Sequence, residues 1–119
     1  MKFRFFLLVL SVFTIMSCSD NGPDITIVSP ENGASYSPGD IINLNVMVTD
    51  DVSVATIGVS SSGLGLNTSD PITGELASVN YTLDITLDAA TPADEYELTI
   101  TATDGDGNFS DEKLTISVE

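Results

Sequence analysis

Apolar and polar residues alternate through most of the chain after residue 24, and no other feature limits the fold as strongly. Six stretches show this period of two: residues 24–28, 42–48, 54–60, 79–87, 96–102 and 114–118. Successive side chains of a β-strand point to opposite faces, so each stretch predicts a strand with one buried face. Gly, Pro, Asn and Asp separate the stretches, as expected for turns.

The sequence predicts six or seven strands, each with one apolar face, and no helical segment after residue 24. Such strands can bury their apolar faces by packing as two face-to-face sheets. The length fits one such all-β domain over residues 25–119. Ser and Gly interrupt the alternation in residues 60–74, so this stretch predicts an irregular connection. The strand order stays open at this point, because an extra C′ strand in place of a D strand is equally compatible.

The N-terminus predicts an export signal. Lys2 and Arg4 precede an uncharged apolar run over residues 5–16. Twelve helical residues rise only about 18 Å, which is short of the roughly 30 Å hydrocarbon core of a membrane. The run therefore favours a cleavable signal peptide over a transmembrane helix.

The residues at the end of this run are Ile15, Met16, Ser17 and Cys18. They resemble the lipobox of bacterial lipoproteins, and the resemblance implies cleavage before Cys18 and lipid attachment to it. We expect a signal peptide over residues 1–17, a lipidated Cys18 with a flexible tether over residues 18–24, and membrane attachment through the lipid. The alternative is an ordinary secretory signal with a coincidental cysteine.

The tether contains Asp20 and Asp24. Acidic residues just after the lipidated cysteine resemble those of some Gram-negative lipoproteins that reach the cell surface. The expected location is therefore the outer membrane or cell surface of a Gram-negative bacterium, with a lipid anchor. Which way the domain faces stays open.

Charge and cysteine content limit the partners and the bonds of the domain. The chain has 18 acidic and 3 basic residues. Lys2 and Arg4 leave with the signal, so Lys113 is the only basic residue of the mature protein, whose formal charge is −17. Such a surface repels phosphate backbones, which excludes nucleic acid as a partner. Cys18 is the only cysteine, so no intramolecular disulfide can form.

Several segments resemble the sequence elements of bacterial Ig-like domains. They are I-V-S-P-E-N-G at residues 27–33, P-G-D at 38–40, V-T-D-D-V-S-V-A at 48–55 and Y-E-L-T-I-T-A-T-D-G-D-G-N at 96–108. The resemblance implies an immunoglobulin-like Greek-key β-sandwich of about seven strands. It also implies that Tyr96 is a tyrosine corner, with its ring in the core and its hydroxyl bonded to a backbone group.

The sequence offers no recognisable catalytic constellation. Histidine is absent, which removes the commonest general base and any Ser-His or Cys-His pair. The many carboxylates fall in no catalytic motif, so we expect that the protein is not an enzyme.

Acidic loops are the sharpest candidate site. Asp50 and Asp51 would form the B-to-C turn, and Asp104, Asp106 and Asn108 the F-to-G turn, at the same end of an Ig sandwich. Their oxygens suit Ca²⁺, which takes six to eight hard oxygen ligands. The competing and favoured interpretation is turn chemistry, since Asp, Asn and Gly populate hairpins for conformational reasons.

Leu64 and Leu66 in the irregular stretch could form an exposed binding loop, although folding over the open end of the sandwich explains them as well. The predicted function is a non-catalytic, lipid-anchored module that binds a protein or glycan at the bacterial cell envelope. The alternative is a structural accessory subunit of an envelope complex, with calcium as a possible stabilising ion. No cofactor besides possible Ca²⁺ is expected.

Overall fold

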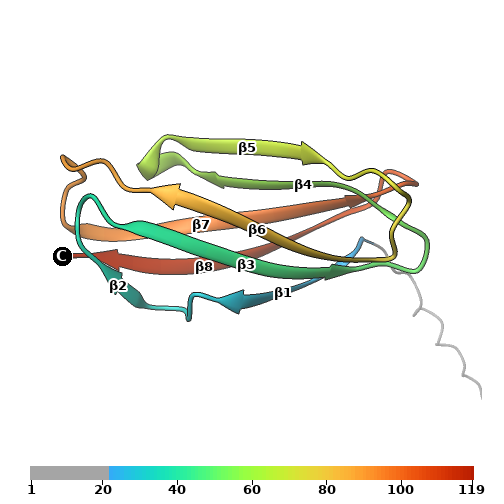
Figure 1. Cartoon of the computed structure of the whole chain (residues 1–119), viewed down its shortest axis with the longest axis horizontal. Coiled ribbons are helices and arrows are strands. Elements are labelled where there is room, and N and C mark those ends of the chain that lie inside the picture. Colours follow the sequence, from blue (N-terminus) through green and yellow to red (C-terminus); the bar gives the residue numbers. More distant parts are fainter. Residues whose placement is uncertain (1–21) are drawn as a thin grey trace, which may run out of the picture.

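All six period-two stretches form strands in the computed structural model, which describes residues 22–119 (Figure 1). The eight strands are β1 (Asp24–Ser29), β2 (Ala34–Tyr36), β3 (Ile41–Thr49), β4 (Val54–Ser61), β5 (Leu66–Pro71), β6 (Ser78–Thr86), β7 (Asp94–Asp104) and β8 (Phe109–Val118). One short 3₁₀ turn, η3 (Ser62–Leu64), follows β4. The predicted signal peptide, Cys18 and the first part of the tether lie outside the described residues.

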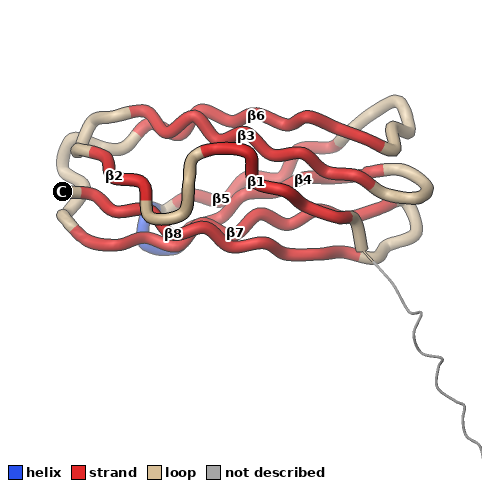
Figure 2. Tube along the Cα trace, turned by 90° about the horizontal axis from the view of Figure 1, so that it is seen from below, coloured by secondary structure: helices blue, strands red, loops and turns tan. Residues whose placement is uncertain are grey.

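The strands form two sheets that pack face to face (Figure 2). One sheet has the order β1–β3–β6, and the other has the order β2–β8–β7–β4–β5. Neighbouring strands are antiparallel, except that β2 pairs with β8 in parallel. The predicted immunoglobulin-like sandwich is confirmed, with eight strands in place of about seven.

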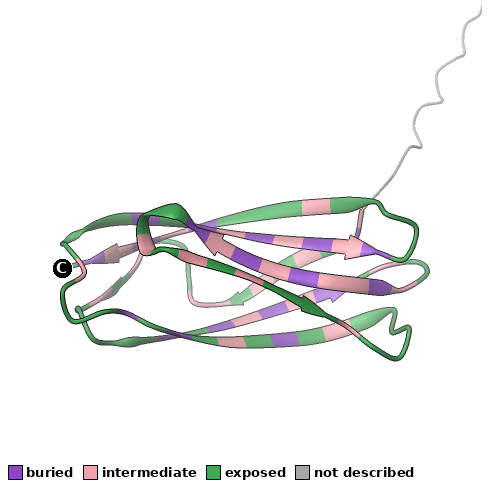
Figure 3. Cartoon of the chain, turned by 90° about the horizontal axis from the view of Figure 1, so that it is seen from above, coloured by how far each residue is buried: buried purple, intermediate pink, exposed green. Residues whose placement is uncertain are grey.

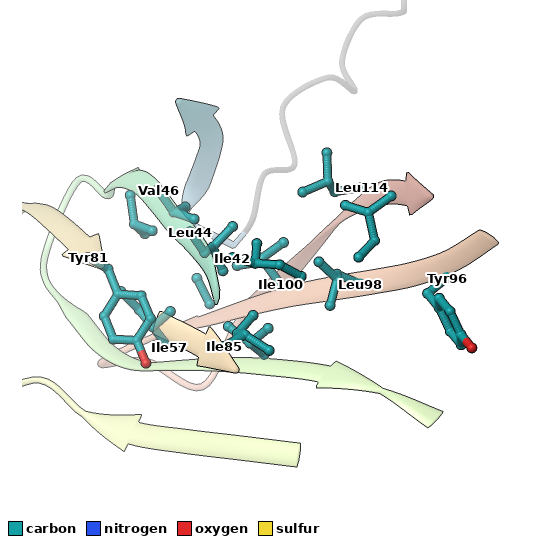
Figure 4. Packing of buried hydrophobic residues seen from close by; sticks show 14 of the residues in the cluster. Ile42, Leu44, Val46, Ile57, Tyr81, Ile85, Tyr96, Leu98, Ile100 and Leu114 are labelled. Carbon is teal, nitrogen blue, oxygen red and sulfur yellow. The ribbon is translucent and has the colours of Figure 1, made fainter. Parts of the chain in front are cut away.

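The core lies between the sheets and consists of the inward side chains of the alternating pattern (Figures 3 and 4). In β3 the four inward residues Ile42, Leu44, Val46 and Val48 are all at most 1% exposed. The other buried apolar residues are Val54, Ile57, Val59, Tyr81, Ile85, Leu87, Tyr96, Leu98, Ile100, Ala102, Leu114, Ile116 and Val118. At about 25 cal/mol per Å² of apolar surface removed from water, this burial is the main favourable term in folding.

The irregular connection predicted for residues 60–74 is wrong in part, because β5 forms there. It pairs with β4 from Ser61–Leu66 to Thr56–Pro71 and forms the edge of the five-stranded sheet, in the C′ position. Its sequence lacks the apolar alternation of the other strands, and none of its residues is fully buried. The structure thereby resolves the open choice in favour of C′.

The two lateral sides of the sandwich close differently. On one side the first strand changes sheets: β1 pairs with β3, and after a register shift between Ile27 and Ser29 the chain continues into β2 on β8. On the other side β5 and β6 are the free edges of their sheets. The Tyr81 hydroxyl on β6 donates a hydrogen bond to the Asp70 carboxylate on β5 and so connects the two sheets.

The strand directions give the sandwich two distinct ends. The entry pole contains Gly22, where the described chain begins, and the connections 50–53, 72–77 and 105–108. The exit pole contains the connections 37–40, 62–65 and 87–93, together with the C-terminus (Figure 1). The predicted tether therefore leaves from the entry pole.

Candidate functional site

The five residues predicted to bind calcium do come together, at the entry pole. Asp50 and Asp51 lie between β3 and β4, while Asp104 ends β7 and Asp106 and Asn108 follow it. They line a hollow of about 540 Å³, whose other lining residues are Gly22, Asp24, Thr49 and Val52. The prediction that these loops share one end of the sandwich is correct.

Two of these carboxylates are already bonded to the backbone of their own turns. Oδ1 of Asp104, which is 5% exposed, accepts the backbone N–H groups of Asp106 and Asn108, each at 2.9 Å. Oδ2 of Asp50 accepts the N–H groups of Val52 at 2.9 Å and Ser53 at 3.2 Å. These are the local side-chain-to-backbone bonds that make Asp favourable in turns.

The geometry thus accounts for Asp50 and Asp104 as turn residues. Within residues 22–119, no group of three or more acidic side chains is placed to hold a metal ion. Calcium binding at this pole stays an untested hypothesis.

Leu64 and Leu66 lie at the exit pole, on either side of Gly65. Both are half-buried and pack against the core cluster. Gly65 takes a left-handed conformation, with φ of 66°, that ends η3 between them. The two side chains therefore belong to the margin of the core, and their predicted role as a binding loop stays untested.

The outer face of the five-stranded sheet has a property that the sequence pattern did not reveal. Every second residue of β7 points outward, and Thr99, Thr101 and Thr103 stand beside Ser60, Gly58 and Thr56 of β4. Asn67 and Ser69 of β5 extend the same rows. We call these eight residues the small polar face; none of them is ionisable, although the chain has 18 acidic residues.

Close strand approach leaves no room for a side chain at the centre of the small polar face. A Cβ atom at Gly58 would lie 2.7 Å from the carbonyl oxygen of Thr68, so no larger residue fits without a shift. At the β8 border, Thr101 Oγ1 donates to Asp111 at 2.7 Å. Beyond it, Lys113 Nζ lies 3.7 Å from Glu97, in an exposed ion pair.

The small polar face leads into a cleft near the exit pole. The pairing of β4 with β7 ends at Ser60 and Thr99, after which β4 turns into η3 and the strands separate. The opening measures about 860 Å³, and its lining residues are Ser60, Ser61, Ser62, Gly63, Gly65, Leu66, Asn67, Glu95, Tyr96, Glu97 and Thr99. Hydroxyl, amide and carboxylate groups therefore dominate its walls.

One polar group at this cleft has no partner. Ser61 is 3% exposed, lies at the cleft and leaves its Oγ without a hydrogen bond within the described residues. Gly63 packs on the ring of Tyr96, where a Cβ atom would lie 2.8 Å from Cδ1. The cleft is thus walled by η3 on one side and by the start of β7 on the other.

Tyr96 confirms the predicted tyrosine corner. Its ring is buried at one end of the core cluster, and its hydroxyl donates to the Pro92 carbonyl oxygen at 2.7 Å (Figure 4). This side chain fixes the connection between β6 and β7 at the exit pole. Its role is structural, and its ring closes one side of the cleft.

Tyr81 is a second buried tyrosine, and its place in the sequence pattern predicts only that it belongs to a strand. Burial and then the hydrogen bond to Asp70 raise the pKa of Tyr81 to about 12. The hydroxyl stays protonated at neutral pH and can hold the Asp70 carboxylate. No local sequence motif predicts this hydrogen bond, because Tyr81 and Asp70 lie on strands of different sheets.

None of the helices within residues 22–119 is long and apolar enough to span a membrane.

Comparisons with known proteins agree with the architecture. The model of a family described as "Bacterial Ig domain" matches residues 23–118. Fibronectin(III)-like modules of Clostridium thermocellum CbhA are similar, with a TM-score of 0.62 and 24% identity over 80% of this chain and 94% of theirs. A Niemann-Pick type C2 protein from the Japanese carpenter ant gives a TM-score of 0.54 and 17% identity, covering 90% of this chain and 100% of its own. At these identities both structures are similar in fold alone, and no curated protein matches.

Proposed function

Because this chain belongs to the family of bacterial Ig domains, we propose that it is a non-catalytic, lipid-anchored module that binds a protein or glycan at the bacterial cell envelope. Cys18 would carry the lipid, in the outer membrane or at the cell surface of a Gram-negative bacterium. Domains of this family are typically non-catalytic, and function must be argued from a site on the fold.

The observation that supports a binding role is the small polar face with its adjoining cleft. A chain with 18 acidic residues repels anions over most of its surface, but here several rows of Ser, Thr and Asn carry no charge. Neutral hydroxyl and amide groups can donate and accept hydrogen bonds without the desolvation cost of a charge. Such a surface suits a polar, uncharged or weakly basic ligand.

The place of the cleft also suits an anchored module. A tether that leaves from the entry pole puts the exit pole, and the cleft beside it, farthest from the lipid. A ligand outside the membrane would reach this end first.

Ser60 gives the sharpest test, because it lines both the cleft and a smaller hollow of about 200 Å³ over the small polar face. Ser60→Arg would place one long, charged, outward side chain between the two and obstruct both. Asn80→Arg is the matched control, since Asn80 is exposed on β6 of the other sheet. Binding is measured by biolayer interferometry against the purified envelope polysaccharide and the solubilised outer-membrane proteins of the producing bacterium.

We expect one of these two fractions to bind the parent domain and the Asn80→Arg control equally. Ser60→Arg should weaken that binding about tenfold or more, which corresponds to about 1.4 kcal/mol or more. Binding that both variants retain would place the ligand elsewhere, and no binding of the parent to either fraction would contradict the proposal.

The anchor has an independent test. Expressed as the full precursor in a Gram-negative host, the protein should fractionate with membranes, and its mature mass should begin at Cys18 with added acyl groups. Cys18→Ala should leave the protein unlipidated and uncleaved at that position, since the thiol is the attachment point. A mature product cut elsewhere and free of lipid would overturn the lipoprotein assignment.

A structural accessory subunit is the second candidate, and the β5 edge favours it. Among the described residues β5 pairs only with β4, so a strand from a larger envelope complex could add to its outer edge. In that case a Pro at an edge position of β5 should release the protein from the complex, while Ser60→Arg should not.

A further inference from the structure

The connections at the entry pole, where the chain enters the fold, carry exposed apolar side chains. Five large apolar side chains are exposed in the described structure: Val28, Ile41, Val52, Leu76 and Phe109. Three of the five, Val52, Leu76 and Phe109, come from the three connections of this pole or the residue next to them. Phe109 is the most exposed, at 64%, and Val52 follows at 59%.

Backbone hydrogen bonds hold these connections together. Val54 N donates to Leu76 O at 2.8 Å, which ties the β3–β4 connection to the β5–β6 connection. Gly105 N donates to Ser53 O at 3.2 Å and so joins the β7–β8 turn to the same group. The three connections are therefore joined through their backbones, which hold the residues that carry the exposed apolar side chains at this pole.

The entering chain lies directly beside Phe109. Gly22 packs so closely on the Phe109 backbone that any side chain at position 22 would collide with it. Only three residues separate Cys18 from Gly22. At 3.3–3.6 Å per residue, this segment can extend at most about 14 Å, so a lipid on Cys18 keeps the pole close to the membrane.

We propose that the entry pole docks on the lipid surface, with Phe109 and Val52 entering the interface beside the anchor. The inference rests on the proposed lipidation of Cys18. Phe and Leu side chains beside a lipid anchor add buried apolar area, and interfacial segments place such side chains about 5–10 Å into the headgroup–acyl boundary. Phe109 pairs with Thr103 and so stands at the entry-pole end of the small polar face. The contact holds this pole, rather than the exit pole with its cleft, against the membrane.

The charge of the pole selects the kind of surface. Asp24, Asp50, Asp51 and Asp106 surround the same hollow as Val52. Carboxylates within a Debye length of about 8–10 Å repel anionic headgroups. The pole therefore fits a zwitterionic surface, and anionic lipid should weaken its contact.

The absence of Trp from the chain allows a direct test, because each substituted Trp is the sole one. Phe109→Trp reports on the pole. Val28→Trp is the matched control, since Val28 is 57% exposed but lies on the flank in β1, and Ala90→Trp reports on the exit pole. Each lipidated protein is reconstituted into phosphatidylcholine vesicles whose acyl chains carry bromine near the headgroup.

We expect the Phe109→Trp emission to shift to shorter wavelength and to be quenched by the brominated lipid, while the other two Trp variants stay unquenched. Adding phosphatidylglycerol at low salt should reduce the quenching of Phe109→Trp. Quenching of all three variants would mean that the domain lies flat, and quenching of none would mean that the tether holds it clear; either result overturns the proposal.

Failure of the anchor itself is distinguished by the mass of the purified protein. Where no acyl group is found, the same variants are coupled through the thiol of Cys18, the only cysteine, to a maleimide-bearing phospholipid. Quenching of Phe109→Trp alone then still supports the docking pole, although the natural lipidation of Cys18 has failed.

Discussion

Strands β7 and β5 belong to the same sheet but are stabilised in different ways. β7 pairs with β4 and β8 on both sides and buries every second residue from Tyr96 to Asp104. β5 pairs with β4 alone and has no fully buried residue. It is connected to the rest of the domain by polar contacts, including Thr68 Oγ1, which accepts the Val59 N–H at 3.1 Å, and the bond from Tyr81 to Asp70.

The comparison shows that the strand that contributes most to the stability of the domain is not the strand whose backbone is most accessible to a partner. A central strand with a buried face contributes most of the free energy of unfolding, because its side chains lose contact with water completely. An edge strand contributes less and leaves one row of backbone groups free for a partner. The small polar face spans both kinds of strand, so we expect its β5 side to adjust more easily than its β7 side.

The largest expected effect is at the centre of β7. Leu98 is 0% exposed, and Leu98→Ala should cost about 3 kcal/mol of unfolding free energy through lost burial and the resulting cavity. The half-buried Leu66 of β5 is the matched site, where the same truncation should cost about 1 kcal/mol. Urea unfolding measures both, and equal losses would contradict the division between central and edge strands.

The end of β7 gives the next effect. Asp104→Ala removes the acceptor of two backbone N–H groups at a buried position and should cost about 2 kcal/mol. Asp104→Asn keeps an oxygen at the same place, so its loss should be about 0.5 kcal/mol. Thermal and urea unfolding distinguish the two; similar losses in both variants would mean that charge, rather than turn geometry, is what this position requires.

Breaking the bond that connects β5 to β6 should have a smaller effect. Tyr81→Phe removes the hydrogen bond to Asp70, and because Asp70 is exposed and can bind water, the cost should be about 1 kcal/mol. Hydrogen exchange in β5 should accelerate more than in β7. Equal acceleration in both strands would show that the two are not independently stabilised.

The same tyrosine predicts how stability changes at alkaline pH. Its pKa is about 12 in the folded domain, against 10.0 for an unperturbed tyrosine, so the unfolded chain loses the proton first as pH rises. The contribution of protonated Tyr81 to the free energy of unfolding is complete below pH 10 and is lost between pH 10 and 12, by up to about 3 kcal/mol. Tyr81→Phe should flatten most of this fall when urea unfolding is followed across that range. Tyr36, whose pKa is raised by burial and then by Asp40, should account for the remainder.

The contrast between β7 and β5 also explains what the sequence can predict. The tyrosine corner at Tyr96 is predictable because neighbouring residues encode it, with its acceptor Pro92 only four positions away. β5 is not predicted from the sequence, because an edge strand with two polar faces lacks apolar alternation. The Tyr81–Asp70 bond, the small polar face and the cleft depend on register between distant strands, which the residues of any one strand do not specify.

The smallest expected effect concerns calcium at the entry pole, where the loops that follow β3 and β7 meet. A ligand that binds only the folded domain raises its stability by RT ln(1 + [L]/Kd). Because turn N–H groups already occupy Asp50 and Asp104, we expect the parent and Asp104→Asn each to melt at the same temperature in millimolar Ca²⁺ as in excess chelator. A calcium-dependent rise in the parent that disappears in Asp104→Asn would instead establish a metal site. It would also show that the turn carboxylates can exchange backbone donors for an ion, which would make this end of β7 adjustable like β5.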